Sequence, residues 1–225
     1  MLTKSTATAN VPLPFVTLVL VGFPAAYLLN SISPWARRFS LEHDVTAFFA
    51  FLAALLALHW LSAGVSIWVL HRSGLRLAHI GLVTSLRTGV SLVLILLAVG
   101  GGLVALRAAL GPAEPLWRGP AAGLHLVTTA QQGAWIVASL SAGFCEELVY
   151  RGFGITLLRA RGFRAWLAVA LPTISWVLVH GVGGALMFVP HFIVGLLFAG
   201  LFLWRRSLAP VMFVHALVDL SLLGT

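Results

Sequence analysis

The chain has 225 residues, of which 60% are hydrophobic and only 9% carry a formal charge. With a mean hydropathy of +1.02, it has too few polar residues to cover a soluble domain, so the composition predicts an integral membrane protein. The net charge of +8 comes from short basic clusters between apolar runs, which is unlike the single basic stripe of a nucleic-acid-binding protein. One cysteine excludes an internal disulfide.

Apolar runs that are long enough to cross a bilayer alternate with short connections along the whole chain. We expect seven spans, within a range of six to eight, and therefore an all-α polytopic transmembrane helix bundle. A cleaved signal peptide is the competing interpretation of the first run. We expect one integral membrane domain over residues 1–225, with the motif-bearing part in 133–220. The expected spans cover residues 11–29, 45–70, 89–106, 133–158, 165–180, 184–203 and 208–223.

Basic residues are distributed unequally between the two sides of this predicted bundle. Alternating the spans places nine on one side, namely Lys4, Arg72, Arg76, Arg87, Arg159, Arg161, Arg164, Arg205 and Arg206. The other side has four, namely Arg37, Arg38, Arg107 and Arg118. Cytoplasmic loops carry the excess of Lys and Arg. We therefore expect the N-terminus to be cytoplasmic, in the plasma (inner) membrane of a prokaryote.

Two adjacent acids lie near the middle of the fourth expected span, in the stretch CEELVYRG at residues 145–152. Ionisable side chains are expensive in lipid, so they turn inward, pair with one another and mark functional cavities. Glu147 and Arg151 are four residues apart, and we expect them to form an internal ion pair on one helix face. Glu146 is rotated by about 100° from its neighbour. It is therefore free to point elsewhere and to act as a general base.

Two histidines and a third acid reach a similar depth from later spans. At about 1.5 Å per helical residue from the basic clusters, Glu146 lies roughly 22 Å deep and His180 roughly 24 Å. On the same scale His215 lies roughly 14 Å deep and Asp219 roughly 20 Å. We expect these four side chains to converge in one layer of the membrane. Interhelical hydrogen bonding without chemistry is the alternative interpretation.

Three motifs in this order resemble those of a known protein family. The stretch EELVYR at 146–151 is similar to EExxxR, WVLVH at 176–180 to FxxxH, and HALVD at 215–219 to HxxxN/D. Together they resemble the CPBP (CAAX protease and bacteriocin-processing) intramembrane proteases, which include the type II CAAX prenyl endopeptidases. The resemblance covers roughly residues 133–220. It implies an intramembrane endopeptidase that hydrolyses a peptide bond of a membrane-associated protein or peptide.

The resemblance also implies a role for each matching residue. Glu146 would activate a water molecule with help from His180, and His215 and Asp219 would stabilise the oxyanion. The family's endopeptidases have Asn where this chain has Asp219, and an ionised Asp cannot donate a hydrogen bond. We therefore expect Asp219 to hold the His215 imidazole in its tautomer.

Further residues are expected to line the cavity. Trp176 stands where the family usually has Phe and keeps an apolar wall. His191 could reach the same layer from the next span, with a plain packed histidine as the alternative. We interpret Cys145 and His59 as packed residues.

The donor set leaves metal dependence open. If hydrolysis depends on zinc, Glu146, His180 and His215 are the expected ligands. The chain lacks the H-E-x-x-H and H-x-x-E-H spacings, so we expect hydrolysis without a cofactor. The expected partners are the lipid bilayer and a membrane-associated substrate, and no nucleic acid. The alternative function is a non-enzymatic membrane protein, either an ion-coupled transporter or a bacteriocin-immunity factor.

Overall fold

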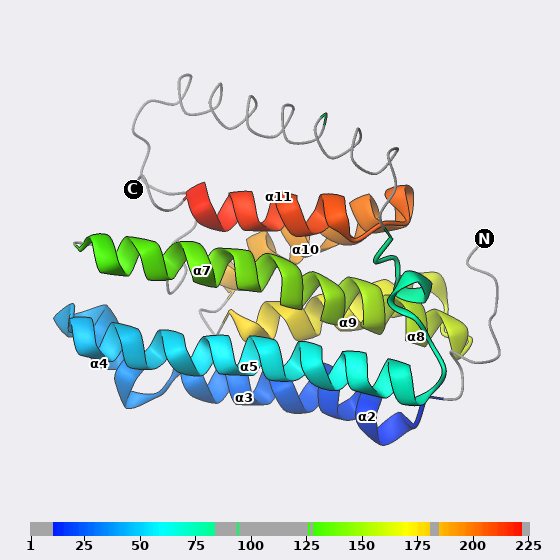
Figure 1. Cartoon of the computed structure of the whole chain (residues 1–225), viewed down its shortest axis with the longest axis horizontal. Coiled ribbons are helices and arrows are strands. Elements are labelled where there is room, and N and C mark those ends of the chain that lie inside the picture. Colours follow the sequence, from blue (N-terminus) through cyan, green and yellow to red (C-terminus); the bar gives the residue numbers. More distant parts are fainter. Residues whose placement is uncertain (1–10, 84–93, 95–125, 127, 181–184, 222–225) are drawn as a thin grey trace.

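Figure 1 shows the computed structural model of the chain, in which helices lie side by side along the long axis of the molecule. The structure describes residues 11–83, 94, 126, 128–180 and 185–221, without the side chains of 40–42 and 185–187. All regular elements in these ranges are helical, which confirms the all-α prediction. They are α2 (Leu13–Thr17), η1 (Leu18–Gly22), α3 (Phe23–Ser31), α4 (Pro34–Glu42), α5 (Val45–Arg72), η2 (Leu77–Ile80), α7 (Thr129–Glu146), η3 (Glu147–Ile155), α8 (Thr156–Ala160), α9 (Ala165–Val179), α10 (Ala185–Arg205) and α11 (Ala209–Leu220).

Several of these helices have the length and composition of membrane spans. The consecutive elements α2, η1 and α3 form one apolar helix, Leu13–Ser31, and α5 and the Phe188–Arg205 part of α10 are also long enough to cross a bilayer. The helices α9 and α11 are apolar but shorter. The expected third span, 89–106, lies outside the described residues except for position 94. The described helices thus form a helical membrane bundle.

The central helix of the bundle carries the acidic motif. It runs without interruption through α7, η3 and α8, from Thr129 to Ala160. Thr128 caps its N-terminus, because its hydroxyl accepts from Gln131 N while the Gln131 side chain accepts from Thr128 N. Every residue from 145 to 158 is buried. This all-round burial puts the motif at the centre of the protein, where charged groups must find partners.

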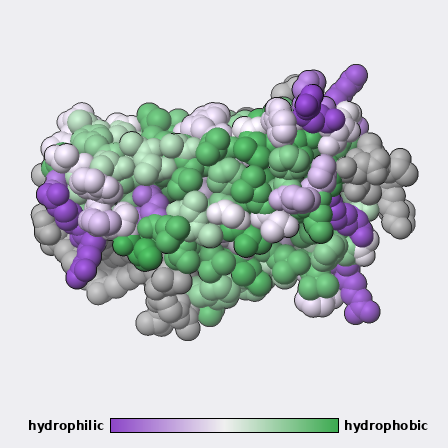
Figure 2. Space-filling view, turned by 90° about the horizontal axis from the view of Figure 1, so that it is seen from below, coloured by the Kyte–Doolittle hydropathy of each residue, from purple (hydrophilic) through white to green (hydrophobic). Residues whose placement is uncertain are grey.

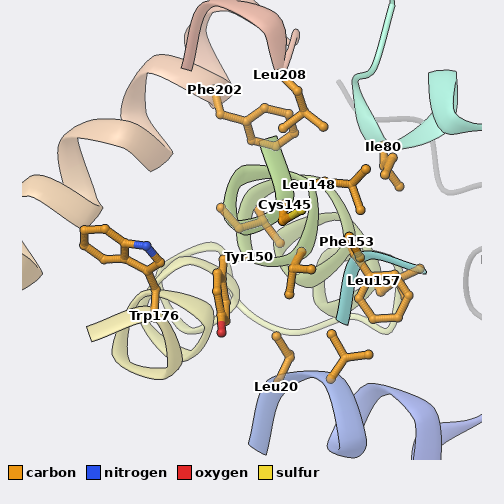
Figure 3. Packing of buried hydrophobic residues seen from close by; sticks show 14 of the residues in the cluster. Leu20, Ile80, Cys145, Leu148, Tyr150, Phe153, Leu157, Trp176, Phe202 and Leu208 are labelled. Carbon is orange, nitrogen blue, oxygen red and sulfur yellow. The ribbon is translucent and has the colours of Figure 1, made fainter. Parts of the chain in front are cut away.

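Figure 3 shows how neighbouring elements enclose this helix. Side chains around it come from four directions, with Leu20 of η1, Trp176 of α9, Phe202 of α10 and Ile80 of η2. Leu208 packs beside Ile80, and its backbone N donates to Gly81 O at 2.8 Å. The η2 turn therefore closes the bundle at the end where α5, α8 and α10 finish.

Charged residues lie at the two ends of the molecule, and an apolar belt lies between them (Figure 2). In Figure 1, α5, α8 and α10 end on the same side, where α9 and α11 begin. The arginines at this side, called the arginine-rich end below, are Arg72, Arg76, Arg159, Arg161, Arg164, Arg205 and Arg206. The helix α4, with Arg37 and Arg38, lies at the opposite end. An apolar belt between charged ends matches the hydrocarbon core of a bilayer between its two polar surfaces.

Candidate active site

Glu146 is the last residue of α7, and two other helices hold its carboxylate. His59 Nε2 of α5 lies 2.7 Å from Glu146 Oε1, and Trp176 Nε1 of α9 donates a hydrogen bond to Glu146 Oε2. The side chain of Glu146 is buried, with 4% of the residue exposed. Both carboxylate oxygens are therefore fixed by nitrogen donors, while each keeps further capacity to accept a hydrogen bond.

Glu147 is the first residue of η3, and its partners are different. Arg151 Nη1 donates to Glu147 Oε1 at 2.7 Å, across the i,i+4 spacing. His215 Nδ1 of α11 lies 2.7 Å from the same oxygen. Glu147 is fully buried, with 0% exposed. It therefore binds a histidine of another helix as well as the arginine of its own.

Glu147, and not Asp219, orients the His215 imidazole. A carboxylate only accepts hydrogen bonds, so the 2.7 Å contact places a proton on His215 Nδ1. Asp219 Oδ2 lies 3.6 Å from His215 Nε2, beyond normal hydrogen-bond distance. The sequence-based expectation that Asp219 sets the tautomer is therefore corrected. The reason is that α11 packs directly on α7 and brings His215 onto the motif.

The free nitrogen of His215 faces both remaining acids. His215 Nε2 lies 3.8 Å from Glu146 Oε2 and 3.6 Å from Asp219 Oδ2. Both distances exceed the normal hydrogen-bond range, so among the described contacts Nε2 makes no direct hydrogen bond to either acid. Three side chains from two of the predicted motifs, EELVYR and HALVD, thus meet around one point.

Arg151 is packed between aromatic rings. Its guanidinium carbon lies 4.6 Å from the centroid of the Trp176 ring and 5.4 Å from that of Phe198. Its Nη2 also donates to Gly195 O of α10 at 3.4 Å. Cation–π contacts and a buried acid together offset the cost of burying this charge.

His180 and His191 lie beside Trp176. The His180 ring centroid is 4.5 Å from that of Trp176 and 4.8 Å from that of His191. His180 Nδ1 lies 3.0 Å from the carbonyl oxygen of Trp176. A carbonyl only accepts, so in the neutral ring Nε2 is left as an acceptor. Among the described contacts, His180 reaches Glu146 through Trp176 and not by a direct hydrogen bond.

Exposure differs between the members of this cluster. Asp219 has 25% of its side chain exposed, and His180 and His191 are half-buried, whereas both glutamates and Arg151 are buried. Trp135 Nε1 of α7 donates to Asp219 O at 3.0 Å and holds the end of α11 in place. In the described part of the chain, the glutamates are therefore reached from the side of Asp219 and His180.

His59 is the residue that the sequence-based prediction missed. It lies near the middle of α5, is 2% exposed and contacts Glu146 directly. A histidine in the centre of an apolar span was a detectable signal, since such residues are rare and face the bundle interior. Its partner could not be identified because no sequence pattern links the second span to the fourth.

The donor atoms of this cluster do not fit a zinc site. Among the described residues, no group of three or more His, Cys, Asp or Glu side chains could hold a metal ion. The donors are already directed at one another, with His59 on one oxygen of Glu146 and Glu147 on Nδ1 of His215.

The C-terminal part of the chain is similar to a known protein family. Residues 129–221 match the family model Rce1-like, whose description is "Type II CAAX prenyl endopeptidase Rce1-like". This segment, called the Rce1-like part below, is similar to that family. The match begins with α7 and ends just after α11, so the Rce1-like part contains the motif glutamates, His180 and His215, but not His59.

The match confirms the resemblance to CPBP proteases. At the level of the Rce1-like family, the activity is that of a CAAX-type intramembrane endopeptidase acting on membrane-associated proteins. No curated protein and no solved structure matches the chain.

Proposed function

We propose that the protein is a glutamate-dependent endopeptidase that hydrolyses a peptide bond of a membrane-associated protein or peptide. The observation that carries this proposal is the buried Glu146 carboxylate, which His59 and Trp176 orient and which lies beside His215. The Rce1-like match supports the reaction type. It also supports a prenylated CAAX tail as the first substrate to test.

In the first step, Glu146 acts as the general base. It takes a proton from a water molecule while the water oxygen forms a bond to the scissile carbonyl carbon. His180 Nε2, left as an acceptor by the contact of Nδ1 with Trp176 O, orients the second hydrogen of that water. The products of this step are a protonated Glu146 and a tetrahedral oxyanion.

In the second step, the carbon–nitrogen bond of the substrate breaks. His215 acts here as an imidazolium, whose Nδ1–H is held by Glu147 and whose Nε2–H donates to the oxyanion and stabilises its charge. Asp219 lies at the exposed rim and assists this side of the site. The protonated Glu146 returns its proton to the leaving amine, which restores the carboxylate. Glu147 and Arg151 act as the supporting ion pair, and Trp176 and His191 line the cavity.

The arginine-rich end supports a cytoplasmic N-terminus. The first described span begins at this end in Figure 1, and positively charged loops remain on the cytoplasmic side. We place the protein in the plasma membrane of a prokaryotic cell with this end inside.

A cleavage assay on purified protein tests the proposal. The probe is a farnesylated CAAX peptide in detergent micelles, with the same peptide lacking the prenyl group beside it. We expect Glu146→Gln to lower kcat by roughly 10²- to 10⁴-fold, the usual contribution of a general base. Ser66→Ala, a buried change elsewhere in α5, should leave cleavage unchanged. Equal cleavage by wild type and Glu146→Gln would contradict the role of Glu146.

A cellular experiment separates this proposal from a non-enzymatic function. Cells with Glu146→Gln protein should accumulate an uncleaved membrane peptide that is absent from cells with the wild type. A phenotype that persists in Glu146→Gln and His215→Ala would instead favour a transporter or an immunity factor.

A further inference from the structure

A histidine from outside the Rce1-like part of the chain reaches the proposed base. His59 belongs to α5 and precedes the matched segment 129–221. Its Nε2 lies 2.7 Å from Glu146 Oε1, and 2% of the residue is exposed. An imidazole in the middle of a span is costly in lipid unless it is paired. The contact with Glu146 provides that pairing.

The packing of α5 against α7 fixes this contact. Trp60, next to His59, donates from Nε1 to Ser141 Oγ at 3.3 Å. Its ring stacks on Phe144 with the centroids 5.7 Å apart. These contacts hold the two helices in register within a few residues of Glu146. The approach of His59 to the carboxylate therefore follows from the fold.

The His59 ring is also held on its other side. The Tyr27 ring of α3 packs against it with centroids 5.2 Å apart. Because a carboxylate only accepts, the contact with Glu146 places a proton on His59 Nε2. His59 Nδ1 is buried and has no hydrogen-bond partner among the described residues. A neutral ring with a free Nδ1 lone pair fits this surrounding, since unpartnered buried acceptors are tolerated better than unpartnered N–H groups.

Two helices therefore hold the plane of the Glu146 carboxylate from opposite oxygens. His59 of α5 binds Oε1, and Trp176 of α9 binds Oε2. We propose that His59 is a positioning residue, supplied by the N-terminal half of the bundle, that orients Glu146 toward the reacting water. This inference rests on the proposed function for its catalytic consequence, while the orientation of the carboxylate is testable separately.

Steady-state kinetics with the farnesylated CAAX peptide test the catalytic consequence. His59→Phe keeps a flat ring but removes the donor. We expect kcat to fall roughly 10- to 100-fold with little change in KM, as for the loss of one hydrogen bond to a charged group. His59→Gln can place an amide N–H near the position of Nε2 and should recover most of the rate. Ser66→Ala, in the same helix and equally buried, should behave as wild type.

Thermal unfolding in detergent measures the contact without any substrate. We expect His59→Phe to lower the Tm of the wild-type protein by several degrees. In a Glu146→Ala background the same change should leave the Tm unchanged or raise it, because His59 has already lost its partner. Equal shifts in the two backgrounds would overturn the proposed contact.

The two measurements distinguish the failure of each proposal. If the wild type cleaves no CAAX probe and no membrane peptide accumulates in cells with Glu146→Gln protein, the proposed function fails. The comparison of the two Tm shifts alone then decides whether His59 holds Glu146. If the cycle shows coupling but His59→Phe keeps full kcat, His59 has no part in positioning the base. The inference is supported if the Tm shifts differ between the two backgrounds, His59→Phe lowers kcat and His59→Gln restores it.

Discussion

Neighbouring glutamates in one helix have separate partners and separate tasks. Glu146 is bound by neutral donors, the imidazole of His59 and the indole of Trp176. Glu147 is bound by the guanidinium of Arg151 and by His215. Glu147 is the ion-pair partner of a permanently charged guanidinium, whereas the described contacts of Glu146 include no Lys or Arg side chain. The assignment of Glu146 as base follows from this difference.

Replacing Arg151 tests the structural role of its ion pair with Glu147. Arg151→Met keeps most of the length of the side chain but leaves Glu147 buried without its cation. We expect a loss of about 3–5 kcal/mol in the free energy of unfolding, the typical cost of breaking a buried ion pair on one side. Arg164→Met, at an exposed position, is the matched control and should change stability little. Unfolding in detergent followed by tryptophan fluorescence measures both, and equal effects would contradict the structural role.

Much of the candidate site could be predicted from single residues and their spacing. The i,i+4 relation of Glu147 and Arg151 depends only on helix geometry, and the structure has that contact. The partner of His215 could not be predicted, because it depends on how closely α11 approaches α7. His59 was interpreted as a packed histidine for a similar reason, since no motif connects it to Glu146.

At the level of the elements, a π-helix follows directly after Glu146. The segment η3 covers Glu147–Ile155 within an otherwise α-helical element. Wider π turns alter the angle between successive side chains and are frequent at functional sites. Hydrophobic periodicity predicted the helix but not this change of winding, because both forms keep the same apolar residues buried.

Close packing between α7 and α11 depends on Gly143. A Cβ added there would lie 2.6 Å from Met212 O and 3.0 Å from Ala216 Cβ, both in α11. We expect Gly143→Ala to cost about 1–3 kcal/mol of stability by overpacking. It should also lower cleavage, because a displaced α11 carries His215 away from Glu146. Gly133→Ala is the matched control in the same helix, since nothing lies within 4 Å of its added Cβ. Thermal unfolding and the peptide assay compare them, and equal behaviour would contradict the packing argument.

Asp44 caps the N-terminus of α5, the helix that carries His59, and its carboxylate titrates. Asp44 Oδ1 accepts from Ala47 N at 3.0 Å, and this hydrogen bond, with Arg38 nearby, holds the pKa of Asp44 below its ordinary value. A lowered pKa in the folded state means that the stabilising contribution is complete above the unfolded pKa, about 3.9. The contribution is lost as the pH falls through the folded value.

Replacing the carboxylate tests this pH dependence. Asp44→Asn keeps a capping oxygen that does not titrate. We expect the Tm of the wild type to fall more than that of Asp44→Asn between about pH 5 and pH 3. The difference should be small, because Asp44 lies near solvent. Parallel Tm curves for the two proteins would show that the cap does not contribute through its charge.

For the molecule as a whole, the ends of the helices determine how the site relates to the membrane. Glu146 lies 14 residues before the end of α8, roughly 21 Å from the arginine-rich end along the helix axis. His180 follows the last residue of α9, and Asp219 is next to the last residue of α11. Both therefore lie toward the end opposite the arginines. If the arginine-rich end is cytoplasmic, substrate reaches the glutamates from the other half of the bilayer.

Cysteine accessibility decides this orientation. Cys145 is the only cysteine and is buried, so Cys145→Ser provides a background for single-cysteine variants. Ala78→Cys places a thiol in the exposed η2 turn at the arginine-rich end, and Ile32→Cys places one at the opposite end, where Ile32 is 63% exposed. We expect a membrane-impermeant maleimide to label Ile32→Cys in intact cells and Ala78→Cys only after lysis, because positively charged loops stay in the cytoplasm. The reverse pattern would place the His180 and Asp219 side toward the cytoplasm, where a CAAX tail is made, and would overturn the charge-based orientation while leaving the site geometry intact.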